Sequence, residues 1–252
     1  MTTESLYDVN HTIHKLGQHR TLCGDSFDPQ AVDALIQHTN KAQLVLTDPP
    51  YAIYGSSTGV GSDIADDRMI RPFFEALART IHHILDDDGA AYIHTDWRSW
   101  SALTEGCRRA QLAVKNCIVW DKQRKGLGVN YMNQHEFIAY CIKTKPQTMT
   151  KKTQHKRKIS DSNVMQYPRP RADDKQHNAA KPIPLLERLI TNTTNENDLV
   201  IDLFGGSGST LIACENTNRR CGLIEIEPRW IEHIAQRYAL HTKANSFFPK
   251  TL

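Results

Sequence analysis

The amino-acid sequence predicts an α/β fold in which a doubly wound, mostly parallel sheet carries helices on both faces. Short apolar runs typical of strands alternate along the chain with segments whose apolar residues recur at helical spacing. Two of these runs end in turns rich in proline or glycine, and ligands bind at such strand ends in open α/β sheets. With 252 residues and 39% hydrophobic composition, the chain can form one domain, residues 1–252, around a substantial core.

Residues 20–142 form the first half of the predicted domain. An apolar strand at 42–47 precedes a loop rich in Gly and Ser at 55–62. Apolar residues at helical spacing then predict a helix that ends near Gly89: Phe74, Leu77, Ile81 and Ile84 or Leu85. The other predicted elements are a strand at 90–94, a helix at 97–112 with Trp97 and Trp100 in the core, and strands at 114–120 and 136–142. His135 and Glu136 open the last strand and are expected in surface or capping roles.

Residues 177–240 form the second half and continue the alternation. The predicted elements are a helix at 183–190, a strand at 198–204, a helix opening at 211, a strand at 220–227 and a helix at 229–240. Such alternation indicates a largely parallel sheet that is covered on both faces. Because the carboxyl ends of parallel strands share one edge, turns after different strands are expected to face one pocket.

One informative turn follows the strand at 42–47 and reads Asp48-Pro49-Pro50-Tyr51. The Asp48 carboxylate can accept a hydrogen bond from an amino group. The carbonyls of the turn can accept others, because its prolines carry no N–H and hold the backbone nearly fixed. Tyr51 offers a ring face on which a heterocycle could stack. These residues suit an exocyclic aromatic amine; the alternative is a Pro-Pro turn with a solvent-facing acid.

A second turn follows the strand that ends at Asp202-Leu-Phe204. The stretch 205–210, Gly-Gly-Ser-Gly-Ser-Thr, leads directly into a helix, an arrangement in which bare backbone approaches a nucleotide closely. It lacks both the GxGxxG spacing of a dinucleotide site and the lysine of a P-loop. The next strand ends in Glu225 and Glu227, about 20 residues further on, where an acid binds ribose hydroxyls. A nucleoside cofactor without phosphates is expected, and S-adenosylmethionine fits.

The two turns carry a resemblance to a known family. Asp48-Pro-Pro-Tyr51 resembles the catalytic motif of the DNA amino-methyltransferases, and Asp202-Leu-Phe-Gly-Gly-Ser-Gly208 resembles their motif for S-adenosylmethionine. The catalytic motif comes first, as in the β class of the N6-adenine and N4-cytosine enzymes. His177-Asn-Ala-Ala-Lys181-Pro182 is similar to the segment before the cofactor strand of that class, and Gly24-Asp25 resembles its acid that contacts the cofactor adenine. The resemblance implies the Rossmann-like fold of methyltransferases.

The resemblance also implies roles for individual residues. Asp48, Pro49, Pro50 and Tyr51 would bind the target base and its amine. Asp202 would bind the methionine amino group of the cofactor, and Glu225, with Glu227 as its rival, would bind the ribose. The full set expected at the cofactor is Asp25, Lys181, Asp202, Phe204, Gly205, Gly206, Ser207, Gly208, Ser209, Thr210 and Glu225. We expect no metal ion.

Positive charge gathers in one segment, although the net charge is only +3. Residues 143–176 contain ten Lys or Arg against three acids and show little apolar periodicity. The resemblance places the target-recognition region of β-class enzymes between the two halves, where this basic excursion lies. Its candidate DNA contacts are Lys151, Lys152, Lys156, Arg157, Lys158, Arg169 and Arg171. The alternative is a solvated loop.

Composition indicates the setting in which the protein works. No apolar run approaches the ~20 residues that span a membrane, and the first residues lack the basic and apolar regions of a signal peptide. The six cysteines form no Cys-x-x-Cys pair, so reduced core thiols and a cytoplasmic location are expected. Double-stranded DNA is the expected partner, and the oligomeric state stays open, a homodimer included.

These features predict an enzyme that transfers a methyl group from S-adenosylmethionine to the N6 amine of adenine in DNA, with a specific or a relaxed sequence preference. N4 of cytosine is the alternative within the enzyme class, because both bases present the same amine geometry. A catalytically inactive nucleic-acid-binding protein that keeps the nucleotide fold is the alternative outside it.

Overall fold

The computed structural model describes residues 12–37, 41–50, 67–126, 130–143, 159–170 and 180–247. Within these ranges the strands are β1 (Ile13–Leu16), β2 (His19–Cys23), β3 (Ala42–Thr47), β4 (Leu85–Thr95), β5 (Leu112–Asp121), β6 (His135–Lys143), β7 (Val164–Gln166), β8 (Leu199–Asp202) and β9 (Arg220–Glu225). The helices are α1 (Pro29–Ile36), α2 (Asp67–Ile84), α3 (Trp100–Arg109), α4 (Ile183–Thr193), α5 (Ser209–Asn216) and α6 (Pro228–Phe247).

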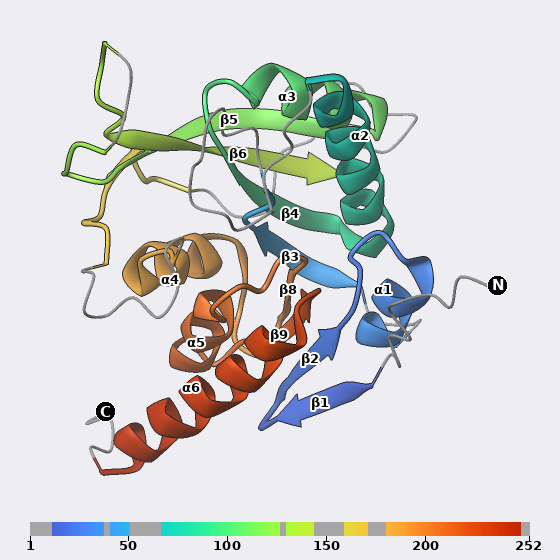
Figure 1. Cartoon of the computed structure of the whole chain (residues 1–252), viewed down its shortest axis with the longest axis vertical. Helices are drawn as coiled ribbons and strands as arrows, with labels where there is room; N and C mark the ends of the chain where they lie inside the picture. The colour runs from blue at the N-terminus through green and yellow to red at the C-terminus, as the bar shows by residue number, and fades with distance from the viewer. Residues whose placement is uncertain are drawn as a thin grey trace, which may run out of the picture.

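All the described strands belong to one sheet of order β1-β2-β9-β8-β3-β4-β6-β5-β7, which crosses the centre of the molecule (Figure 1). The central pairs β2–β9, β9–β8, β8–β3 and β3–β4 are parallel, and β7 runs parallel to β5. The pairs β1–β2, β4–β6 and β6–β5 are antiparallel. This confirms the predicted α/β class with a mostly parallel sheet. The carboxyl ends of β3 and β8 lie side by side, which places both turn motifs at one edge.

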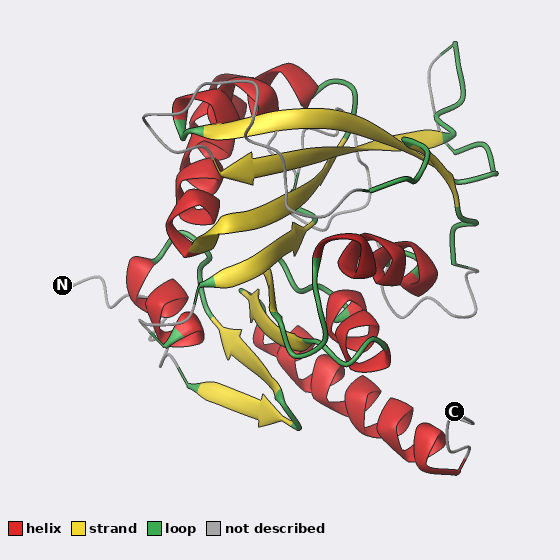
Figure 2. Ribbon diagram, turned by 180° about the vertical axis from the view of Figure 1, so that it is seen from behind, coloured by secondary structure: helices red, strands yellow, loops and turns green. Residues whose placement is uncertain are grey.

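Helices cover both faces of the sheet, with α1, α2 and α3 on one side and α4, α5 and α6 on the other (Figures 1 and 2). Each side has its own core, and β3 contributes to both. Val45 packs on the side of α1–α3, whereas Leu44 and Leu46 pack on the side of α4–α6. A strand that is buried on both faces reads as a continuous apolar run, which is why its position was predictable.

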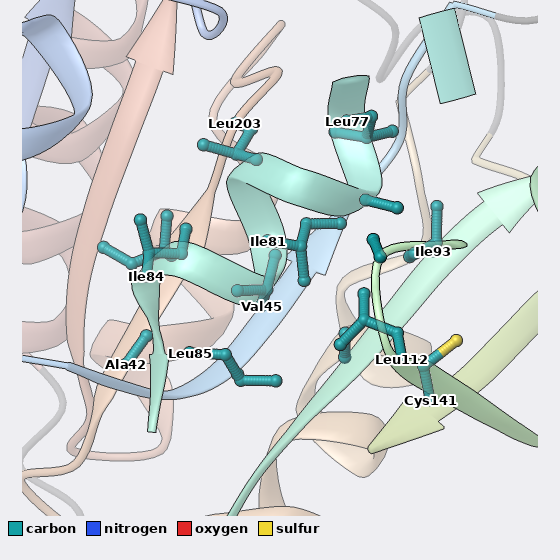
Figure 3. Close-up of a cluster of buried hydrophobic side chains, with 14 of the residues drawn as sticks. Ala42, Val45, Leu77, Ile81, Ile84, Leu85, Ile93, Leu112, Cys141 and Leu203 are labelled. Carbon is teal, nitrogen blue, oxygen red and sulfur yellow. The ribbon is translucent and has the colours of Figure 1, made fainter. Parts of the chain in front are cut away.

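Figure 3 shows the core beneath α2. Leu77, Ile81 and Ile84 of this helix lie over Val45 of β3 and Ile93 of β4, and none of the five side chains has measurable exposure. The helical spacing of the α2 residues therefore reports their burial, as predicted. Full burial of each such side chain contributes about 1.5–3 kcal/mol. Together they fix the strand that carries the candidate catalytic turn.

Several elements differ from the sequence prediction. The short elements β1, β2 and α1 were not predicted, because β2 contains His19 and Arg20 and shows no clear period. His19 is nevertheless fully buried, since its ring pairs with Glu215 of α5 at 2.8 Å. The helix predicted at 97–112 is shorter, and the expectation that Trp97 lies in the core is wrong, because its surface is 63% exposed. Trp100 packs against the core of α1–α3, as expected.

The basic segment, predicted as an excursion from the compact domain, is partly built into the sheet. Its described part, residues 159–170, contains β7, which extends the sheet beside β5 and buries Met165. Asp161 accepts hydrogen bonds from Arg188 at 2.6 Å and from Asn192 at 2.8 Å, which ties this part to α4. A three-residue strand is too short to produce a sequence period, so only pairing with β5 reveals it.

The six cysteines are free thiols, as expected, and four of them are buried. The sulfur atoms of Cys107 and Cys141 lie 3.9 Å apart, well beyond the ~2.05 Å of a disulfide bond. In the part of the chain that the structure describes, no helix is long and apolar enough to cross a membrane.

Candidate active site

Asp48 stands directly after β3, at the carboxyl edge of the sheet. One of its carboxylate oxygens, Oδ2, pairs with the Lys181 ammonium at 2.7 Å. The other, Oδ1, is buried and has no hydrogen-bond partner among the described residues. Burial raises the pKa of Asp48, and Lys181 opposes that rise. A buried acceptor without a donor is costly, so Oδ1 is suited to receive one from a bound molecule.

The other residues of the catalytic motif are described in part. Pro49 is buried and Pro50 is partly buried, so the turn is held against the protein rather than projecting into solvent. Tyr51 and the Gly/Ser-rich loop at 55–62 lie outside the described residues. The stacking role of Tyr51 therefore stays a prediction.

Asp202 joins the two motif-bearing strands. Its Oδ1 accepts hydrogen bonds from the Thr47 hydroxyl at 3.0 Å and from the Phe204 N–H at 3.1 Å, and its Oδ2 accepts one from the Thr210 hydroxyl at 2.6 Å. Thr47 in turn accepts the Leu203 N–H at 3.2 Å. Burial raises the pKa of Asp202 to about 7, although these hydrogen bonds favour the ionised form and lower the pKa. The geometry gives Asp202 a structural role, and its contact with the methionine amino group stays a prediction.

The glycine turn between β8 and α5 depends on left-handed backbone. Gly206 and Gly208 have φ values of 49° and 76°, which other residues rarely adopt. A Cβ at Gly208 would also lie 2.9 Å from Cγ1 of Ile234 on α6. The Arg237 guanidinium of α6 donates to the Ser207 carbonyl at 2.8 Å. Helix α6 therefore supports the turn, in which Ser207, Ser209 and Thr210 are buried.

Glu225 supports the same turn from the end of β9. Its two carboxylate oxygens accept the Gly206 N–H at 2.7 Å and the Glu227 N–H at 3.0 Å. The side chain of Glu227 is 42% exposed and pairs with Arg229 at 2.5 Å. Both acids thus lie at the predicted edge, and the binding of a ribose by Glu225, with Glu227 as its rival, stays a prediction.

The remaining cofactor candidates reach this edge from β2 and β8. The Gly24 N–H donates to the Glu225 carbonyl at 3.0 Å, which places Asp25 beside the end of β9. The rings of Phe27 and Phe204 lie 6.3 Å apart, edge to face. Residues from three separate segments therefore converge where the sequence predicts the cofactor.

Lys181 contacts the turn after β3, and its predicted contact with the cofactor stays a prediction. Its ammonium contacts Asp48 and also Glu136 of β6, at 3.0 Å from Oε2. Glu136 in turn pairs with Lys122 at 3.4 Å, and its side chain is only 16% exposed, so the expectation of a surface role for Glu136 is wrong. No sequence signal identifies this cluster, because its members lie 14 to 133 residues apart along the chain.

The candidate DNA contacts are described only at Arg169, which is exposed. The other six, Lys151, Lys152, Lys156, Arg157, Lys158 and Arg171, lie outside the described residues. The connection between β5 and β6 also exposes Arg124, Lys125 and Tyr131, the last of which is 88% exposed. Among the described residues, no group of three or more His, Cys, Asp or Glu could hold a metal ion.

Comparison with known proteins decides the family. The N6/N4 methyltransferase family model, described as DNA methylase, matches residues 42–237, a range that includes both turn motifs. The chain belongs to the N6/N4 DNA methylase family. The resemblance carried by its two motifs is thereby confirmed, and the protein is a DNA methyltransferase.

Individual relatives of this DNA methylase are distant. The DNA adenine methyltransferase YhdJ of Escherichia coli is 27% identical over 217 residues, covering 75% of this chain and 73% of the relative. The structure of the M1.HpyAVI–SAM complex is 22% identical, with a TM-score of 0.64 and coverage of 86% and 97%. The cytosine-N4-specific PvuII DNA methyltransferase is 18% identical, with a TM-score of 0.68 and coverage of 90% and 91%. The two structures confirm the methyltransferase fold.

Proposed function

We propose that this DNA methylase transfers a methyl group from S-adenosylmethionine to the N6 amine of adenine in DNA. The observation that carries the proposal is the buried, unpartnered Oδ1 of Asp48 at the end of β3. It lies on the same sheet edge as the glycine turn, because β3 and β8 are adjacent and parallel. An amine acceptor and a nucleoside-binding turn on one edge are what such a transfer requires.

The residues around the glycine turn fit S-adenosylmethionine. They offer a nucleoside-sized edge with an aromatic ring at Phe204 and acids at Glu225, Glu227 and Asp25, and no lysine in the turn itself to bind phosphate. The SAM complex of M1.HpyAVI, which shares the fold, supports this cofactor. When bound, S-adenosylmethionine supplies a methyl group on a positively charged sulfur.

The protein's own contribution is positional and electrostatic. The lone pair of an aromatic amine is delocalised into the ring, so the nitrogen is a poor nucleophile. Asp48 Oδ1 accepts one amine N–H and the Pro49 carbonyl accepts the other, which favours a more pyramidal nitrogen and stabilises the positive charge that develops on it. The surplus amine proton leaves to solvent after transfer. Tyr51 stacks on the base, which must leave the duplex to reach the edge of the sheet.

The base assignment rests on the sequence Asp-Pro-Pro-Tyr and on similarity to an adenine methyltransferase. The likeness to the cytosine-N4-specific PvuII enzyme keeps cytosine as the alternative. Incubation of the protein with labelled S-adenosylmethionine and DNA, followed by nucleoside analysis, is expected to yield N6-methyladenine. N4-methylcytosine would overturn the base assignment and leave the amine site intact. Cofactor binding without transfer to any DNA would favour the inactive nucleic-acid-binding protein.

We further propose that the basic excursion contacts DNA phosphates. Replacing Lys156, Arg157 and Lys158 by Ala is expected to weaken binding to all sequences alike and to reduce the salt dependence by about one unit of slope per lost phosphate contact. Thermal stability should change little, because exposed charges contribute little to folding. Binding titrations at several salt concentrations measure both effects.

A control with the same change in charge is available on α2 and α3. Arg79, Arg108 and Arg109 are exposed there, on the face of the sheet opposite α4. Their replacement by Ala should leave DNA affinity and its salt slope unchanged. Equal losses in both triple variants would mean that net charge, rather than the excursion, determines binding.

A further inference from the structure

Four charged side chains from separate elements form a chain of ion pairs behind the amine site. Asp48 follows β3, Lys181 precedes α4, Glu136 lies in β6 and Lys122 follows β5. The Lys181 ammonium lies 2.7 Å from Asp48 and 3.0 Å from Glu136, and the Lys122 ammonium lies 3.4 Å from Glu136. Their side chains are between 8% and 23% exposed. Two cations therefore balance two carboxylates in a largely buried position.

The Lys181 ammonium also contacts the ring of Trp120. It lies 5.6 Å from the centre of the Trp120 ring, a distance at which a cation is attracted to the ring face. Trp120 is 1% exposed, and its indole N–H donates to the Tyr167 carbonyl at 2.8 Å. The segment after β7 thus fixes Trp120, and Trp120 supports the ammonium. A long, flexible lysine side chain is restrained here to one position.

The cluster matters for Asp48 because a buried carboxylate ionises only with compensation. A protonated Asp48 would use one oxygen as a donor and would lose acceptor strength toward an amine. Of the two Asp48 oxygens, Lys181 pairs with Oδ2, and Oδ1 has no hydrogen-bond partner among the described residues. Glu136 pairs with the same ammonium, so it helps to fix the position of the ammonium. Burial opposes the ionisation of Glu136, but Lys181 and Lys122 outweigh it and hold the pKa of Glu136 at about 2.

We propose that Lys181 and Glu136 are positioning residues for methyl transfer: Lys181 keeps the Asp48 carboxylate ionised, and Glu136, balanced by Lys122, anchors the ammonium so that Oδ1 faces the target amine. This inference rests on the proposed function of Asp48. It gives Lys181 a role on the amine side of the site rather than at the cofactor alone.

Two further titratable groups stand near the cluster in the described part of the chain. His94 of β4 is fully buried, and burial together with Lys181 lowers its pKa to about 3, so it stays neutral. Asp202 of β8 interacts with Asp48 by charge, and its pKa is about 7. His94 interacts by charge with both Lys181 and Glu136, and Asp202 interacts by charge with Asp48. Both groups are present in the wild type and in every variant compared.

The test measures the Asp48 pKa and the turnover rate in the same variants. Carboxyl ¹³C NMR titration of labelled protein, with the Asp48 signal assigned from Asp48→Asn, gives the pKa without any reaction. Turnover at saturating DNA and cofactor gives the acid limb of kcat. An ionised Asp48 is the active form, so kcat is lost as the pH falls through its pKa.

The two variants should move that pKa in opposite directions. Lys181→Met removes the cation and should raise the Asp48 pKa and shift the acid limb to higher pH, by about one unit or more. Glu136→Gln removes a negative charge that repels the Asp48 carboxylate, so it should lower the Asp48 pKa and shift the acid limb to lower pH. Its kcat should fall about tenfold, because the ammonium loses its anchor. The KM for S-adenosylmethionine should stay within about twofold in Glu136→Gln.

Controls separate positioning from general damage. Glu75→Gln removes a carboxylate that also bridges two cations, Arg79 and Arg109, on the far face, and should leave the acid limb unchanged. Lys181→Arg keeps the positive charge and should retain the wild-type acid limb at a lower kcat. This variant still tests the inference if Lys181→Met does not fold. An active enzyme whose Asp48 pKa is the same in wild type and Glu136→Gln would overturn the inference. The expected pKa shifts without methyl transfer in the wild type would instead overturn the proposed function.

Discussion

Replacement of Asp48 by Ala is expected to lower the rate of methyl transfer by about 10²–10³-fold and to leave the affinity for S-adenosylmethionine within about threefold. In the proposed function the carboxylate accepts the amine at Oδ1, and its ion pair within the described chain is with Lys181 rather than with the glycine turn or Glu225. Loss of one preorganised electrostatic contact in a buried site lowers kcat by about 10²–10³-fold. Single-turnover rates and calorimetric titration of the cofactor measure the two quantities.

Asp48→Asn is the matched control for shape. It keeps one acceptor oxygen but removes the charge, so a residual rate above that of Asp48→Ala is expected. The amide also leaves the Lys181 ammonium with Glu136 as its only acidic partner in the described cluster. Loss of cofactor binding in both variants would show that Asp48 serves the cofactor side of the site, contrary to the proposed division between the two turns.

Replacement of Asp202 by Ala is expected to remove cofactor binding and to lower the free energy of unfolding by at least about 3 kcal/mol. The Thr47 hydroxyl, the Phe204 N–H and the Thr210 hydroxyl would all lose their acceptor, and all are buried or nearly so. The backbone of the glycine turn would then be held only from the side of Glu225 and α6. Chemical denaturation and cofactor titration measure the effects.

Asp198→Ala provides the comparison just before the same strand. Its carboxylate accepts one backbone hydrogen bond, from Asn195 at 2.7 Å, in an exposed position before β8. Its loss should cost no more than about 1 kcal/mol and leave cofactor affinity unchanged. The loss in the free energy of unfolding for Thr210→Val should lie between those of Asp198→Ala and Asp202→Ala, because it removes one of the three hydrogen bonds to Asp202. If Asp202→Ala lost no more stability and no more cofactor affinity than Asp198→Ala, Asp202 would not hold the turn.

Long periodic elements and strand-end turns were predictable because their causes are local. The α2 residues Leu77 and Ile81 repeat at helical spacing because one face of the helix is buried. The continuous apolar run of β3 follows from burial on both faces of the sheet. Short elements such as β2 and β7 were missed, because their stability comes from pairing with β9 and β5 rather than from their own sequence.

The sequence by itself determined the class of sheet, the two turns after β3 and β8, and the order that places the Asp-Pro-Pro-Tyr turn before the glycine turn. These depend on residue type and spacing over a few positions, which the chain displays directly. The backbone needs of Gly206 and Gly208 belong to the same local chemistry, although the contact of Gly208 with Ile234 does not.

Only the tertiary structure decided what surrounds Asp48. Lys181 looks like part of a cofactor segment along the chain, and Glu136 like the exposed start of a strand. Folding brings both to within 3.0 Å of one another and Lys181 to 2.7 Å from Asp48. Ionic contacts between residues far apart in sequence leave no period or motif, because any buried acid can be matched by a base from any neighbouring element. The charge state of the candidate catalytic group is therefore a property of the assembled sheet.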